Sequence, residues 1–209
     1  LSQHDTNQFQ QSFSAFYLLL LPLGHIELAD EYLDRAIAIQ NHFNPEGVLY
    51  HAEIQRIESK IQQQKYSQSH DLLKNLMTEA LDDIGQQETQ ALFAYNSHFL
   101  KDNINAYTSA KPVLENPKST VKAKTYAAIA FILSAEQLER TNEAKDAFMQ
   151  LKKIITVKDP ITYTIYLDML SRVPQAWVEQ KELQDLKYAF DKQMSQIKYT
   201  TTPKSDLLY

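Results

Sequence analysis

Glycine is almost absent from this chain: three of its 209 residues are Gly. Tight β-turns need glycine at positions of positive φ, so a β-rich protein of this length would contain more of it. Helix interiors disfavour glycine for entropic reasons, and the abundant residues here, Gln, Leu, Ala, Lys and Glu, favour helices. The same scarcity excludes the serine-hydrolase elbow, the Walker loop and the dinucleotide-binding turn, which all depend on glycines. We therefore expect an all-α protein with none of these loops, and not an enzyme.

Apolar residues recur at i, i+3, i+4 and i+7 along most of the chain, which is the spacing of an amphipathic helix. Breaks that contain proline, glycine or polar clusters separate these segments and predict about ten helices. We expect one domain over residues 1–209 with flexible ends at 1–7 and 200–209. Its antiparallel helix pairs are predicted at residues 8–43, 47–84, 86–115, 119–157 and 160–199.

Two segments give sharper predictions. The apolar stripe from Leu72 to Ile84 predicts one helix three turns long across that range. Residues 120–137 are apolar nearly all round, and a helix without a polar face belongs in the middle of a stack.

A two-residue pattern recurs near the start of each predicted second helix. It consists of a small residue and, four positions later, an apolar residue. These small residues are Ala29, Ser69, Ala106 and Ala144, at spacings of 40, 37 and 38. A close approach of the two helices of a pair requires a small residue there. The turn glycine Gly24 precedes Ala29 by five residues.

This pattern resembles the second helix of the tetratricopeptide (TPR) repeat, whose period is about 34 residues. The resemblance covers roughly residues 9–157. The small residue that the family has in its first helix is replaced by Tyr17, Ile57 and Ile132. The resemblance implies a right-handed superhelical stack of helix pairs, with a concave groove lined by the first helix of each pair. It also implies a protein- or peptide-binding scaffold or sensor, similar to the effector-binding parts of larger bacterial regulators.

A ligand groove on the first helices is the corresponding site prediction. The helix predicted at 48–64 has one polar face with i, i+4, i+7 and i+11 spacing, and further polar and tyrosine side chains lie on later first helices. The predicted groove residues are His51, Gln55, Glu58, Gln62, Tyr95, Asn96, Tyr126 and Gln137. An alternative is a small-molecule effector domain, which would need an apolar pocket that residues 120–137 help to line.

Charge argues against nucleic acid as a direct partner. The formal net charge is −5, and a phosphate-binding surface needs a basic face. We interpret Lys118, Lys122 and Lys124 as solvated helix faces. The acidic run Glu27, Asp30, Glu31 and Asp34 is interpreted in the same way, with Glu31 paired to Arg35 at i+4.

No cofactor or metal site is expected. Cysteine is absent, and the six histidines are scattered one per element at positions 4, 25, 42, 51, 70 and 98. No apolar run reaches the roughly 18–20 residues that span a bilayer. Because the chain begins with Leu1, we expect it to be a piece of a longer protein. A cytoplasmic and a periplasmic location both fit.

The predicted last helix carries an apolar stripe that nothing downstream covers. It either caps the array or forms a homodimer seam. The residues of this stripe are Leu183, Leu186, Phe190, Met194 and Ile197.

Overall fold

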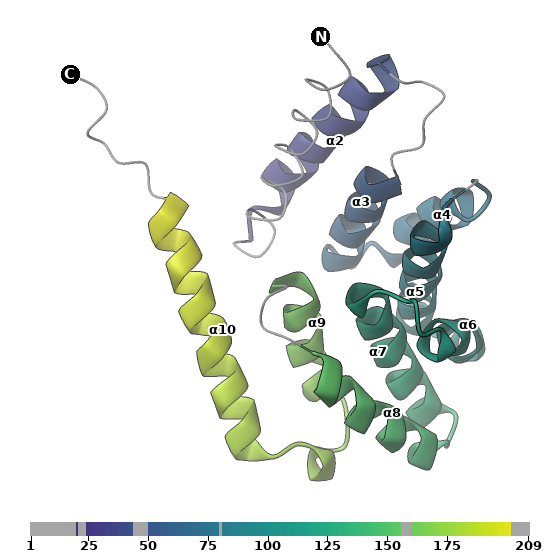
Figure 1. Ribbon diagram of the computed structural model, residues 1–209, viewed down its shortest axis with the longest axis vertical. Coiled ribbons are helices and arrows are strands. Elements are labelled where there is room, and N and C mark those ends of the chain that lie inside the picture. Colours follow the sequence, from purple (N-terminus) through teal and green to yellow (C-terminus); the bar gives the residue numbers. More distant parts are fainter. Residues whose placement is uncertain (1–19, 21–23, 44–49, 80, 156–159, 202–209) are drawn as a thin grey trace. The chain divides into compact units, whose positions relative to one another are not determined.

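The computed structural model describes residue 20 and residues 24–43, 50–79, 81–155 and 160–201. Within these ranges the chain is helical and contains no strand, as the sequence predicts. The chain divides into two compact units, residues 1–154 and residues 155–209, and each is described by itself. Figure 1 shows the helices coloured along the sequence.

The described helices of the first unit are arranged in sequential contact. Each helix packs against the next one along the chain, and α3 also contacts α5, while α5 contacts α7. These helices are α2 (Ile26–Phe43), α3 (Tyr50–Gln62), α4 (Tyr66–Leu76), α5 (Asp83–Phe99), α6 (Asn103–Glu115), α7 (Val121–Gln137) and α8 (Thr141–Ile154).

One turn recurs before each even-numbered helix of this unit. Its marker is a single residue of positive φ, and the four such residues in the described part of the chain are Gly24, Gln64, Lys101 and Glu139. The next residue donates its backbone N–H to the carbonyl five positions earlier, at 2.8–3.1 Å, in all four turns. This is the six-to-one bond of a Schellman helix end. The sequence indicates the turn only at Gly24, because the other three positions are not glycine.

The small residue of the sequence repeat lies five positions after each of these turn residues. Ala29, Ser69, Ala106 and Ala144 are each the fourth residue of their helix and are each 0% exposed. Burial continues one turn later along the same face, at Leu33, Leu73, Ala110 and Phe148. The positions picked out from the sequence therefore occupy equivalent places in α2, α4, α6 and α8.

Helix α7 forms the centre of the first unit. It packs against α5, α6 and α8, and its residues from Thr125 to Ala135 are all buried. The prediction that 120–137 occupies the middle of the helices is confirmed. Its start is fixed by Thr120, whose hydroxyl accepts the Ala123 backbone N–H at 3.1 Å as an N-cap.

The single helix predicted from Leu72 to Ile84 is wrong. Helix α4 ends at Leu76, and Asp82 starts α5 by accepting the Gly85 backbone N–H at 2.7 Å. The side chains of Met77 and Ile84 are exposed instead of facing the core. The aspartate cap interrupts the helix although the apolar spacing continues across it.

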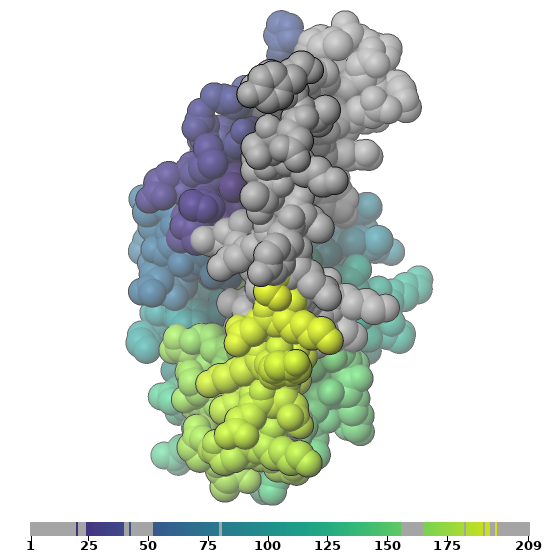
Figure 2. Space-filling view, turned by 90° about the vertical axis from the view of Figure 1, so that its left-hand side faces the viewer, coloured from purple at the N-terminus to yellow at the C-terminus, as the bar shows by residue number. Residues whose placement is uncertain are grey.

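The second unit contains α9 (Pro160–Leu170), the short 3-10 turn Gln175–Trp177 and α10 (Gln180–Thr201). Helix α9 contacts α10 and buries Tyr166 and Met169. Figure 2 shows the described side chains of α10 in yellow at the surface. None of the helices in the described ranges is long and apolar enough to cross a bilayer.

Candidate functional site

A buried carboxylate on α3 is the centre of the candidate site. Glu58 is 1% exposed, and two donors from α7 meet at one of its oxygens, Oε1. The Lys122 ammonium lies 2.8 Å from Oε1, and the Tyr126 hydroxyl donates to it at 3.0 Å. The other oxygen, Oε2, is buried and has no hydrogen-bond donor among the described residues. A buried acceptor without a partner is uncommon and costs free energy.

Helix periodicity brings the two donors together. Lys122 and Tyr126 are four residues apart on α7, so both side chains project from the same face. Tyr95 of α5 packs its ring edge-on against Tyr126 at a centroid distance of 5.3 Å. Tyr95 also lies 4.9 Å from the ring of Phe99. Helices α3, α5 and α7 therefore each contribute a side chain to one cluster, although α4 and α6 intervene in the sequence.

Burial raises the pKa of the Glu58 carboxyl above its ordinary value. The charge of Lys122 and the hydrogen bonds from Lys122 and Tyr126 oppose this effect without cancelling it, and the nearby Glu88 carboxylate adds to the rise. Glu88 of α5 is itself buried and accepts a hydrogen bond from the Thr120 hydroxyl at 3.3 Å. The cluster therefore contains two carboxylates and one ammonium.

Of the other predicted groove residues on α3, Gln55 lies one turn before Glu58 and is half-buried. Its Oε1 is buried and, like Glu58 Oε2, has no partner among the described residues. Gln62 is half-buried one turn after Glu58. The side chain of His51 lies outside the described residues.

Asn96 and Gln137 do not join the cluster. Asn96 is fully buried between α4 and α5, where its Nδ2 donates to the Tyr66 carbonyl at 3.0 Å. The Ser69 hydroxyl donates to Asn96 Oδ1 at 2.6 Å. Asn96 thus joins its helix to the small residue of the preceding repeat. Gln137 is exposed at the last position of α7.

Two cluster residues, Lys122 and Glu88, were missed by the sequence analysis. The interpretation of Lys122 as part of a solvated face is wrong, because its side chain is 27% exposed and paired with Glu58. Its spacing of four from Tyr126 on an otherwise apolar helix is the signal that could have indicated it. For Glu88 the sequence carries no comparable signal.

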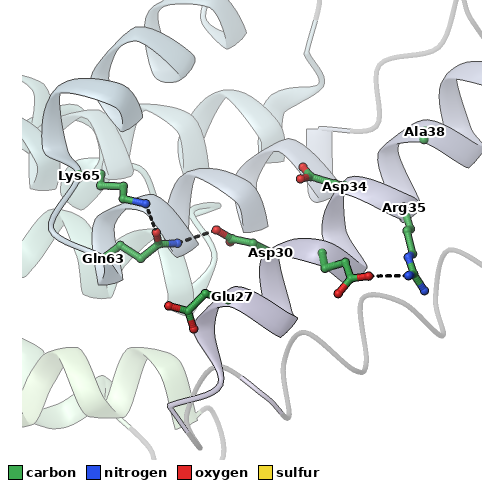
Figure 3. A pocket seen from close by; sticks show the side chains of 8 residues that line it. Glu27, Asp30, Asp34, Arg35, Ala38, Gln63 and Lys65 are labelled. Atoms are coloured by element: carbon green, nitrogen blue, oxygen red, sulfur yellow. Dashed lines mark hydrogen bonds and ion pairs between the residues drawn. The ribbon is translucent and has the colours of Figure 1, made fainter.

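A second acidic cluster forms a shallow hollow on α2 and α3, with a volume of about 540 Å³ (Figure 3). Glu27, Asp30 and Asp34 line it together with Gln63 and Lys65. The expected pair of Glu31 with Arg35 is present at 2.5 Å, with both side chains more than half exposed. Most of this run is therefore an ordinary solvated face, as predicted.

Asp30 is the exception in that run. It reaches α3 and accepts hydrogen bonds from Lys60 at 2.8 Å, from Gln63 at 2.7 Å and from the Ser59 hydroxyl. Burial alone would raise the pKa of Asp30, but these hydrogen bonds and the charge of Lys60 outweigh it, and the pKa is lowered. Asp30 therefore joins α2 to α3 as an ionised, fully bonded side chain.

In the described ranges, no three His, Asp or Glu side chains are grouped closely enough to hold a metal ion. His98, for example, has its Nδ1 3.1 Å from both Ser134 Oγ and Asn103 Oδ1, which is a structural contact among α5, α6 and α7. Of the predicted apolar stripe on α10, Leu183 and Leu186 are half-buried. The side chains of Phe190, Met194 and Ile197 lie outside the described residues.

Comparison of the chain with protein-family models, with curated proteins and with solved structures gave no match.

Proposed function

We propose that residues 26–154 form a TPR-like superhelical stack that binds a protein or peptide segment along α3, α5 and α7, within a larger regulatory or signalling protein. The observation that carries the proposal is the buried cluster to which these three helices each contribute. The repeated turns and small residues support equivalent pairs, since a stack of like units needs the same close approach in each one.

The cluster favours a ligand that supplies N–H donors. Glu58 Oε2 and Gln55 Oε1 are acceptors, they lie one turn apart on α3, and neither has a donor among the described residues. Buried acceptors gain most from a donor that replaces lost water, and charged acceptors gain about twice as much as neutral ones. The two carboxylates outnumber the single ammonium of Lys122, and an added cation would favour the ionised form of Glu58, whose pKa is raised. We therefore infer an extended segment with a Lys or Arg side chain.

Selection of binders from a random linear peptide library tests this proposal. Selected peptides should contain a basic residue and should protect α3, α5 and α7 from hydrogen–deuterium exchange. Glu58→Gln should weaken their binding by about tenfold, the value of one charge-assisted hydrogen bond. The matched control Asp34→Asn, at an exposed carboxylate on α2, should leave the affinity unchanged. Peptides without basic residues, or equal losses in both variants, would contradict the proposal.

A further inference from the structure

A second hollow lies on another part of the first unit, between α6 and α8 with α7 beneath it. Its volume is about 610 Å³, within the range of small-molecule sites. All of its lining residues belong to residues 111–154. None of the Glu58 cluster lines it, so the two candidate sites are independent.

Part of the lining of this hollow is apolar, and all three helices contribute to that part. Helix α7 contributes Ala128 and Phe131, α6 contributes Leu114, and α8 contributes Leu151 and Ile154. Contact with these side chains would favour an aliphatic or aromatic group, because binding removes its apolar surface from water.

The wall of the hollow is held in place by an aromatic and ionic network. The ring of Phe131 stacks on Tyr107 at 4.6 Å, and the Arg140 guanidinium lies 4.7 Å from the Tyr107 ring centroid. The Tyr107 hydroxyl donates to Glu143 at 2.6 Å, and Arg140 lies 3.4 Å from the same carboxylate. A preformed wall lowers the entropic cost of binding.

Among the charged side chains that line the hollow, the positive ones without an ion-pair partner in the described part of the chain outnumber the negative ones. Among its three carboxylates, Glu115 is paired with Lys111 at 3.8 Å and Glu143 with Arg140, which leaves Asp146. Lys124 and Lys153 also line the hollow, and neither has an ion-pair partner among the described residues. Two ammonium groups therefore remain against one carboxylate.

In contrast to the exposed Lys153, Lys124 shares a helix face with part of the apolar lining. It is half-buried and stands four and seven residues before Ala128 and Phe131, so all three share one face of α7. A half-buried ammonium beside an apolar surface is stabilised by an anion more than a fully solvated one is. From this arrangement we propose that the hollow binds a small monocarboxylate with an apolar tail, its carboxylate at Lys124 and its tail over Ala128 and Phe131.

Titration of the full chain with octanoate, followed by calorimetry and NMR, tests the site. Octanoate should bind saturably and shift resonances of α6, α7 and α8. Lys124→Gln should weaken binding by about tenfold, and octan-1-ol, which lacks the charge, should bind more weakly by a similar factor. The control Lys118→Gln, at an exposed lysine outside the hollow, should bind as the wild type does.

A second variant keeps the test independent of the lysine. Ala147→Phe places a ring in the hollow from α8 at a half-buried position. It should abolish octanoate binding while thermal unfolding remains a single transition. Absence of saturable binding in the wild-type chain, equal losses in Lys124→Gln and Lys118→Gln, or full affinity in Ala147→Phe would each overturn the proposal. None of these results bears on peptide binding at Glu58.

Discussion

Asp30 and Glu58 are two carboxylates that meet a lysine at the same distance, 2.8 Å, yet their pKa values move in opposite directions. Asp30 is partly exposed, and both of its oxygens accept hydrogen bonds from α3. Glu58 is buried, and both of its donors meet at one oxygen while the other has none among the described residues. One ion pair of a given length therefore does not determine the state of a carboxylate.

The difference between the two regions teaches how desolvation and hydrogen bonding compete. Burial raises the pKa in both places, and only enough donors can reverse it. Asp30 accepts hydrogen bonds from three side chains, and its lowered pKa favours the ionised form that connects α2 with α3. Glu58 has one buried oxygen with no donor among the described residues, and its two donors do not offset the effect of burial on its pKa.

Removal of the paired lysine should give the largest difference in stability loss between the two sites. Lys122→Met leaves Glu58 buried with one donor and should lower the free energy of unfolding by about 2–3 kcal/mol at neutral pH. Lys60→Met leaves Asp30 with two donors and should cost about 1 kcal/mol. Urea denaturation at neutral pH measures both. The comparison fails if the two variants lose equal stability.

Removal of one hydroxyl donor at each site is the next largest test. Tyr126→Phe should cost about 1.5 kcal/mol, because Glu58 then depends on Lys122 alone. Ser59→Ala should cost less, about 0.5–1 kcal/mol, because Lys60 and Gln63 still bind Asp30. Chemical denaturation of the two variants beside the wild type gives the order. A larger loss in Ser59→Ala would contradict it.

The two carboxyls should give pH slopes of opposite sign. Because the pKa of Glu58 is raised, the folded state binds more protons above the ordinary glutamate pKa, and stability falls as pH rises through that window. Because the pKa of Asp30 is lowered, its contribution is present above the ordinary aspartate pKa and is lost as pH falls toward the folded value. Each slope is at most about 1.4 kcal/mol per pH unit. Glu58→Gln should remove the first slope and Asp30→Asn the second, in urea midpoints measured across pH.

The smallest effects should come from two glutamines of α3. Gln63 donates to Asp30, so Gln63→Leu should cost about 0.5 kcal/mol. Gln55 has a buried oxygen without a partner, so Gln55→Leu should be neutral or slightly stabilising. Thermal melts of both variants suffice. A clear loss in Gln55→Leu would show that its oxygen is already satisfied.

The all-helical class and the buried faces of several helices could be predicted from the sequence, because apolar spacing indicates which face of a helix is covered. The four small residues were located correctly, since close helix contact excludes larger side chains at these positions. The end of α4 at Leu76 was not located correctly. The apolar spacing continues past it, but Asp82 caps the start of the next helix.

The candidate site was predictable only in part. Glu58, Tyr95 and Tyr126 were selected together because they lie on first helices, and the structure brings them into one cluster. Lys122 was missed because an isolated lysine on a helix is ordinarily solvated. Its pairing with Glu58 joins α3 to α7 across 64 positions of sequence, and spacing within one helix cannot report such a contact.

The recurring left-handed turn sets which face of α2, α4, α6 and α8 carries the small residue. The distance from the turn residue to the buried small residue is five in all four cases, whereas successive small residues are 40, 37 and 38 apart. Each residue added to a helix rotates the following side chains by about 100° around its axis. An insertion between the turn residue and the small residue would therefore move the small residue away from the helix that it contacts. Length variation is therefore excluded from this segment and accumulates elsewhere in the repeats. The spacing between successive small residues can therefore vary while each of the four stays buried in its helix.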